Sequence, residues 1–287
     1  MTTSAALSSV PIVAAPTSDH GSTGSRQSSA PGLLTAVGVE ILKMRRLRAP
    51  QITMLIVGAS VALCSMNLFG TSFTELSHDP HAMPWARLLL TTGFFNAMVG
   101  PILVSVLASR QTDIEHTGSG WNLAATSGLT PGTLCRAKLA ALSLLIVPAV
   151  TVQSLGIIML ARFRGLSVAL DVGPWATYTT LLICVDLATC AYFLWLAAVV
   201  ENQLIVMSTG LLSGFIGIFT LLVPPEIVRW TPWGYYALIT PAAMSATAHS
   251  QPDVTYIDVP AGWIAGFLIL TALIFTVVTH RLNRIER

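Results

Sequence analysis

The chain has 287 residues, of which 53% are hydrophobic and only 10% are charged, and its formal net charge is +2. A soluble domain usually carries about 25% charged residues, so this composition is typical of a membrane protein with several spans. The small net charge gives no overall basic field, and we therefore expect no nucleic-acid partner.

The first 31 residues are dominated by Ser, Thr, Ala, Pro and Gly and show no hydrophobic periodicity. Such a segment cannot bury enough apolar surface to offset the entropy lost on ordering, so we predict a disordered cytoplasmic tail over residues 1–31. It is not typical of a signal peptide, because its start lacks Lys and Arg and its short apolar stretch is broken by proline. Residues 32–287 are then expected to form a single membrane domain.

Residues 33–49 predict an amphipathic helix that precedes the first span. On a helical wheel one face is apolar (Leu33, Leu34, Val37, Ile41, Met44) and the other is polar (Thr35, Glu40, Lys43, Arg46). Arg45 and Arg48 follow on the C-terminal end, and Pro50 is expected to stop the helix. We interpret it as an elbow helix that lies in the headgroup layer with its basic side toward anionic lipid. An ordinary juxtamembrane basic cluster is the alternative.

Six apolar runs follow, each close to the ~20 residues that a transmembrane helix needs. They cover approximately Gln51–Phe69, Leu88–Ala108, Leu139–Leu160, Trp175–Val200, Leu204–Val223 and Val259–Thr279. Pro101 and Pro148 lie within the second and third runs, where we expect kinks rather than helix ends. The predicted fold is therefore an all-α integral membrane protein with six spans and an elbow helix.

The basic residues predict the orientation, because cytoplasmic loops carry an excess of Lys and Arg. With a cytoplasmic N-terminus, the inner segments hold most of them: Lys43, Arg45, Arg46, Arg48, Arg110, Arg136, Lys138, Arg281, Arg284 and Arg287. The outer segments hold Arg87, Arg162, Arg164 and Arg229. This bias, with an even number of spans, places both termini and residues 110–136 in the cytoplasm, and we expect the chain in the cytoplasmic membrane.

No catalytic or cofactor motif is present. The chain lacks GxxxxGK[ST], HExxH and GxSxG, so we expect no nucleotide, zinc or acyl-transfer site and no catalytic residue of its own. His78 and His81 flank Asp79 in a predicted outer loop, and a metal site there competes with the simpler interpretation of a polar loop. We expect the polar loop and no bound metal.

Asp186 is the one ionisable residue deep in an apolar run. A carboxylate at the centre of a span costs about 2.5–3.5 kcal/mol on insertion scales, so it should face the bundle interior or water. It is a candidate for a substrate or proton pathway. The alternative is a packing residue that is hydrogen-bonded to Thr189 or Gln153.

Residues 110–136 form a polar, charged segment between two apolar runs. Read as a helix, it places Ile114, Trp121 and Ala125 on one side, with Asp113, Glu115 and His116 on a polar face. Thr130 can then cap the next helix, with Pro131 at its first position. Because Trp is a good anchor for a partner's pocket, we interpret the segment as a docking element.

The stretch "IEHTGSGWNLAATSGLTPGTLCRAKL" resembles the first cytoplasmic loop of type-2 ABC transporter permeases. The residues that match in order are Glu115, Gly120, Trp121, Leu123, Pro131 and Lys138. The stretch "EILKMRRLRAP" is similar to the family's elbow helix, and "VPPEIVRWTPWGYYALITP" to a short helix that dips back between spans five and six. Within the family the chain is most similar to exporters of lantibiotic or bacitracin-type peptides, often used in self-immunity. Two departures are Gly132-Thr133, where a basic residue often follows the proline, and the long polar tail.

The resemblance implies that residues 110–136 are a coupling loop that docks on a separate ATPase subunit through Asp113, Glu115, His116, Trp121, Leu123 and Pro131. It also implies that Glu40, Lys43, Arg45, Arg46 and Arg48 belong to the elbow helix. The permease would move hydrophobic or amphipathic cargo outward, with ATP and Mg²⁺ held by the partner. Six spans make half of such a pathway, so a second copy or a paralogous permease is expected as a partner. Membrane lipid is expected as a further partner.

Two other classes remain open from the residues alone. A secondary transporter or channel would need charge pairs within the membrane or broken inverted repeats, and neither is evident. A non-transporting membrane anchor or sensor for an ATPase is the second alternative. Co-purification of an ATPase and ATP-dependent efflux together would separate these classes.

Overall fold

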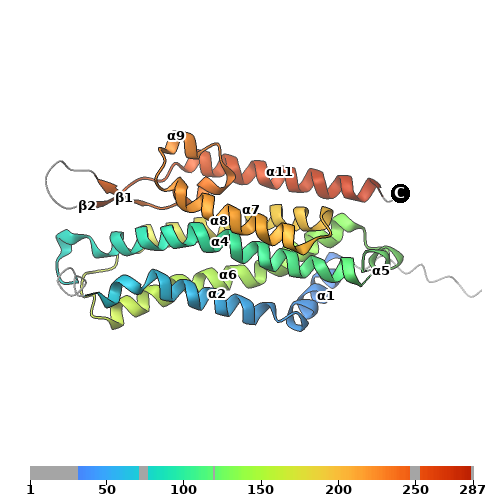
Figure 1. Ribbon diagram of the computed structural model, residues 1–287, viewed down its shortest axis with the longest axis horizontal. Coiled ribbons are helices and arrows are strands. Elements are labelled where there is room, and N and C mark those ends of the chain that lie inside the picture. The colour runs from blue at the N-terminus through green and yellow to red at the C-terminus, as the bar shows by residue number, and fades with distance from the viewer. Residues whose placement is uncertain (1–31, 71–76, 119, 246–252, 286–287) are drawn as a thin grey trace, which may run out of the picture. The chain divides into compact units, whose positions relative to one another are not determined.

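The computed structural model describes residues 32–70, 77–118, 120–245 and 253–285 (Figure 1). The predicted tail, residues 1–31, lies outside the described residues. The long helices are α1 (Leu33–Arg46), α2 (Ala49–Cys64), α4 (Pro84–Thr117), α6 (Pro131–Phe163), α7 (Val172–Val199), α8 (Gln203–Thr220) and α11 (Ala261–Ile285). The short elements are η1 (Met66–Phe69), η2 (Pro80–Ala82), α5 (Gly120–Thr126), α9 (Pro225–Val228), η3 (Pro232–Gly234), α10 (Tyr235–Leu238), β1 (Ala242–Ser245) and β2 (Asp253–Tyr256).

Five of these helices, α4, α6, α7, α8 and α11, are long and apolar enough to cross a membrane. The pair α1 and α2 makes a sixth candidate only if the two are taken as one span, because they meet at a 66° bend. Alone, the 16 residues of α2 rise about 24 Å, which is less than the ~30 Å of a bilayer core. The described residues therefore make a largely helical, multi-pass membrane protein with five or six spans.

The helix starts and breaks follow local sequence rules. Arg48 takes a left-handed conformation (φ 56°) at the bend, and Pro50 lies in the first turn of α2, so the first helix ends at Arg46 rather than at residue 49. Pro101 and Pro148 lie inside α4 and α6, which continue through them as predicted. Thr130 caps α6 and Pro131 is its first residue, as the sequence indicates.

Helix α4 is packed between α2, α7 and α8, while α6 contacts α1, α2, α7 and α11 (Figure 1). Helix α8 approaches α4 closely because Gly210, Gly214 and Gly217 face it, and a methyl group at these positions would overlap Ser105 or the α4 backbone. Small residues at such contacts are typical of helix packing in membranes, where close backbone approach supplies much of the attraction.

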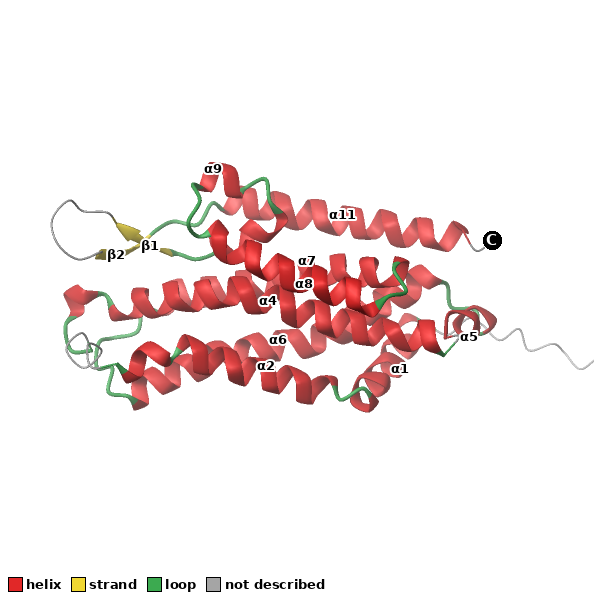
Figure 2. Ribbon diagram, in the orientation of Figure 1, coloured by secondary structure: helices red, strands yellow, loops and turns green. Residues whose placement is uncertain are grey.

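A small antiparallel hairpin departs from the all-α prediction. Strands β1 and β2 pair from Ala242 with Tyr256 to Ser245 with Asp253, at the end of the bundle opposite α5 (Figure 2). The stretch that precedes β1 forms three short helical pieces, α9, η3 and α10, rather than one helix. Each strand has only four residues, too few for the alternating pattern that predicts a strand.

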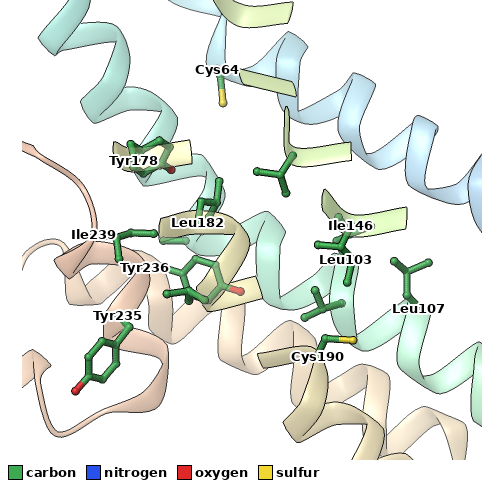
Figure 3. Close-up of a cluster of buried hydrophobic side chains, with 14 of the residues drawn as sticks. Cys64, Leu103, Leu107, Ile146, Tyr178, Leu182, Cys190, Tyr235, Tyr236 and Ile239 are labelled. Carbon is green, nitrogen blue, oxygen red and sulfur yellow. The ribbon is translucent and has the colours of Figure 1, made fainter. Parts of the chain in front are cut away.

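The core combines aliphatic side chains with a few buried phenols (Figure 3). The aliphatic part of this core comes from α4, α6 and α7 and includes Leu103, Leu107, Ile146 and Leu182. The buried Tyr178 hydroxyl accepts a hydrogen bond of 3.0 Å from the Asn96 side chain. Polar pairs of this kind join helices that have no hydrophobic driving force between them in lipid.

Candidate functional site

Helix α5 joins the ends of the two longest helices. Helices α4 and α6 contain 34 and 33 residues, so they rise about 51 Å and 50 Å and exceed the ~30 Å bilayer core by ~20 Å. The seven residues of α5 connect the C-terminal end of α4 to the N-terminal end of α6, at the end of the bundle where α11 also ends (Figure 1). Every residue that was predicted to dock a partner lies between Asp113 in the last turns of α4 and Pro131 at the start of α6.

Trp121 is held to the bundle through His116. The Nε2 atom of His116 lies 2.9 Å from the carbonyl oxygen of Ala197, which can only accept, so Nε2 carries the proton. Nδ1 is then free to accept the indole N–H of Trp121 at 3.4 Å. The Ala197 carbonyl belongs to the last turn of α7, where helix carbonyls lack partners within the helix. Trp121 and His116 thus anchor α5 to α7, and Trp121 is half-buried rather than free.

Leu123 is the predicted docking residue that the structure leaves most exposed. Its side chain is 72% exposed on α5, whereas Asp113, His116 and Pro131 are half-buried. A large apolar side chain that is exposed in this way is a candidate contact for a partner. Within α5, Leu123 is thus the residue best placed to enter a pocket of another protein.

Glu115 does not present its carboxylate at the surface. It is 3% exposed, and its Oε1 accepts hydrogen bonds from Lys43 at 2.6 Å and from Lys138 at 2.9 Å. Glu40 accepts from the same two ammonium groups, at 2.7 Å and 2.8 Å. We call Glu40, Lys43, Glu115 and Lys138 the ion-pair cluster. It joins α1, α4 and α6 and carries no net charge when all four residues are ionised.

Lys138 is the centre of the ion-pair cluster. Its side chain is fully buried, and it donates to Glu40, to Glu115 and to the backbone oxygen of Gln111 at 2.8 Å. These bonds use all three donors of the ammonium group. The Gln111 side chain adds a bond of 2.7 Å to Glu40. A buried charge with all its hydrogen bonds made is tolerated, whereas one left alone is strongly unfavourable.

The sequence places Lys138 in an inner segment, but it does not indicate the partners of its side chain. The apolar neighbours of Lys138 along the chain indicate a span, but they cannot show that two carboxylates from α1 and α4 meet its side chain. Glu40 and Lys43 likewise face the bundle rather than lipid headgroups, and the buried side of α1 is Ala36, Glu40 and Met44. Arg45, Arg46 and Arg48 are exposed.

Two glycines let neighbouring segments approach the ion-pair cluster and the helix ends. A methyl group at Gly120 would overlap the Glu115 carboxylate, so the first residue of α5 rests directly on the ion-pair cluster. A methyl group at Gly132 would overlap the backbone oxygen of Thr279 in α11, and the Gly132 N–H donates to the Asn283 side chain at 2.8 Å. This close contact gives a structural reason for glycine at position 132.

Asp186 lies in the middle of α7 with 2% exposure, and it accepts a hydrogen bond of 2.7 Å from the Tyr236 hydroxyl. Gly100 of α4 leaves the space that Tyr236 and Asp186 occupy. Gln153, one of the two partners suggested by the sequence, instead donates to Ser60 at 2.8 Å and Asn96 at 2.6 Å. A tyrosine from the region after α8 was not foreseeable from helical spacing, because it lies 50 residues further along the chain.

The loop with the candidate metal ligands is held by local hydrogen bonds. Asp79 accepts from the backbone N–H of His81, and His78 lies 2.9 Å from the Ser167 hydroxyl. Over the part of the chain that the structure describes, no three His, Cys, Asp or Glu residues gather as a metal site would require.

No protein-family model matches the chain. No curated protein matches it either.

Proposed function

We propose that the chain is the permease subunit of an ATP-driven exporter of the type-2 ABC class, which moves hydrophobic or amphipathic cargo across the cytoplasmic membrane. The proposal starts from the resemblance of residues 114–139 and of the first helix to that family. In this function ATP and Mg²⁺ are held by a separate ATPase subunit, and a second permease copy or a paralogue completes the pathway. Peptide antibiotics and drugs are the cargo class that the resemblance favours.

The observation that carries the proposal is the way α5 is connected to the membrane helices. It bridges two helices that are each about 20 Å longer than a bilayer core, and it rests on the ion-pair cluster through Gly120. Movement of α5 would therefore be passed to α4 and α6 directly, and to α1 through Glu115 and Lys43. The contact of His116 with Ala197 adds α7.

In the proposed mechanism, the ATPase subunit binds Leu123. When this subunit moves, it displaces α5 together with the adjoining ends of α4 and α6. The bundle then changes between two arrangements, and ATP binding by the partner biases which one is populated. The ion-pair cluster keeps α1, α4 and α6 moving together, since separating them would leave buried charges without partners. Asp186 in the middle of α7 and its partner Tyr236 in α10 are candidates for the pathway itself.

The test replaces Leu123 by Asp. Because this side chain is 72% exposed, membrane insertion and thermal stability should be unchanged. Loss of a central apolar anchor typically costs 2 kcal/mol or more, so binding of the ATPase subunit should weaken about thirtyfold, and ATP-dependent efflux should fall with it. Met244→Asp is the matched control, because Met244 is 67% exposed at the opposite end of the bundle.

Native binding and efflux in Leu123→Asp would contradict the proposal. An ATPase that co-purifies with the native chain without any ATP-dependent efflux would instead support an anchor or sensor. Efflux that follows an ion gradient and needs no ATP would support a secondary transporter. Leu123 is a sharper test position than Glu115, whose replacement would also damage the ion-pair cluster.

A further inference from the structure

A long apolar groove runs between α7 and α11. It has a volume of about 930 Å³, at the upper end of the ~300–1,000 Å³ of typical ligand pockets. Its α11 side includes Gly262, Gly266, Leu270, Ile274 and Val278, which recur every four residues and form one stripe. These 16 residue steps rise about 24 Å, more than half of the ~30 Å bilayer core. A hydrocarbon chain that enters at one end can therefore lie in the groove along its whole length.

The groove is unfilled beside two glycines of α11, and it is lined by aromatic side chains at one end. Nothing lies within 4 Å of a Cβ built on Gly262 or Gly266, so the space beside the first two turns of α11 is unfilled. Trp230, Trp233 and Trp263 line the end of the groove near the start of α11. Trp is enriched at the level of lipid headgroups, so Trp230 and Trp263 favour a position of this end near a membrane surface, with the stripe below it in hydrocarbon.

Arg229 supplies a cation at the aromatic end. Its guanidinium carbon lies 5.2 Å from the ring centroid of Trp263, which fixes the side chain beside the groove. None of the ion pairs formed among the described residues involves Arg229, and its Nε is buried without a hydrogen-bond partner. A buried guanidinium N–H that lacks an acceptor is unfavourable, and an anionic oxygen is the partner that suits it best.

We propose that this groove binds one phospholipid of the leaflet on the α9 side, with its phosphate against Arg229 and one acyl chain along the α11 stripe. The charge, the headgroup-level aromatic residues and the unfilled apolar length all fit one amphipathic anion that the membrane itself supplies. The site does not depend on the proposed transport function. It makes α11, which otherwise contacts only part of the bundle, a helix whose packing is completed by a lipid.

The experiment counts phospholipids bound to the purified full-length chain by native mass spectrometry during titration with phosphatidylglycerol. Arg229→Gln should weaken binding about tenfold or more, because a charged hydrogen bond is lost. Arg164→Gln is the matched control: Arg164 also stacks on an aromatic ring, 4.7 Å from Phe69, but donates to the backbone oxygen of Leu68 and does not line the groove. The Arg164→Gln variant should bind phospholipid as tightly as the native chain does.

A second pair of variants tests the acyl-chain part. Gly266→Leu fills the groove and should abolish binding, whereas Gly58→Leu, placed in equally open space on α2, should leave it unchanged. Diacylglycerol with the same acyl chains, which lacks the phosphate, should bind Arg229→Gln and the native chain equally. Excess inorganic phosphate should not displace the phospholipid.

Three results would overturn the proposal. The first is equal phospholipid binding by the native chain and Arg229→Gln. The second is equal loss of binding in Arg229→Gln and Arg164→Gln, which would indicate a general surface effect. The third is dissociation of a dimer by Gly266→Leu with no change in bound lipid, which would make the groove an interface between two copies of the chain.

Discussion

Replacing Lys138 by Met tests the ion-pair cluster most severely. The ammonium group is fully buried and makes bonds of 2.8 Å to Glu40, 2.9 Å to Glu115 and 2.8 Å to the Gln111 backbone. Met has a similar length and leaves little cavity, so the change mainly removes charge. Two buried carboxylates then share one ammonium, that of Lys43, which is 27% exposed. Breaking a buried pair in this way costs about 3–5 kcal/mol.

The assay is thermal unfolding of the purified chain in detergent. A loss of about 3–5 kcal/mol corresponds to a fall of about 6–20 °C in Tm for a domain of this size. Adding Glu115→Gln to Lys138→Met restores neutrality, since Glu40 and Lys43 remain as a pair. The double variant should therefore be more stable than the sum of the two single changes by about 1–3 kcal/mol.

Two results would refute this reasoning. One is a loss below about 1 kcal/mol in Lys138→Met, which is the scale of an exposed ion pair rather than a buried one. The other is strict additivity of Lys138→Met and Glu115→Gln, which would mean that the two side chains do not interact.

Two further predictions concern close contacts away from the ion-pair cluster. Tyr236→Phe removes the hydroxyl that donates to Asp186 at 2.7 Å and should lower stability by about 1–3 kcal/mol, measured as a fall in Tm; an unchanged Tm would show that Asp186 is satisfied by another group. Gly132→Val should overlap the Thr279 backbone oxygen and cost about 1–3 kcal/mol, whereas Gly173→Val, where a Cβ meets open space, should change the Tm much less; equal shifts would contradict the close approach of α6 and α11.

The sequence was sufficient to locate the membrane helices and several helix ends. Apolar runs of about 20 residues correspond to α4, α6, α7, α8 and α11, and Thr130 with Pro131 marked the start of α6 correctly. Apolar runs and helix starts are determined by residues that are close together in the chain, so a single sequence is enough to recognise them. The first run became the shorter α2 followed by η1, because the chain turns at Cys64 and Ser65.

The partners of the polar residues could not be predicted in the same way. Glu40 reaches Lys138 across 98 positions, and Asp186 reaches Tyr236 across 50. A helical wheel shows that Glu40 and Lys43 share a face, but it cannot tell whether that face meets headgroups or other charges. The one available signal was that acids and bases lie near the ends of apolar runs, where burial would require them to pair.

Site-specific photocrosslinking from position 123 tests the proposed docking role of α5 most directly. A photoreactive residue there, in cells that carry out export, should crosslink to a protein with ATPase activity, and the yield should change between ATP-bound and ATP-depleted membranes. The same probe at Leu211, an exposed apolar position on α8, should crosslink to lipid or to other spans instead. Crosslinks from position 123 that never contain an ATPase would contradict the role proposed for α5.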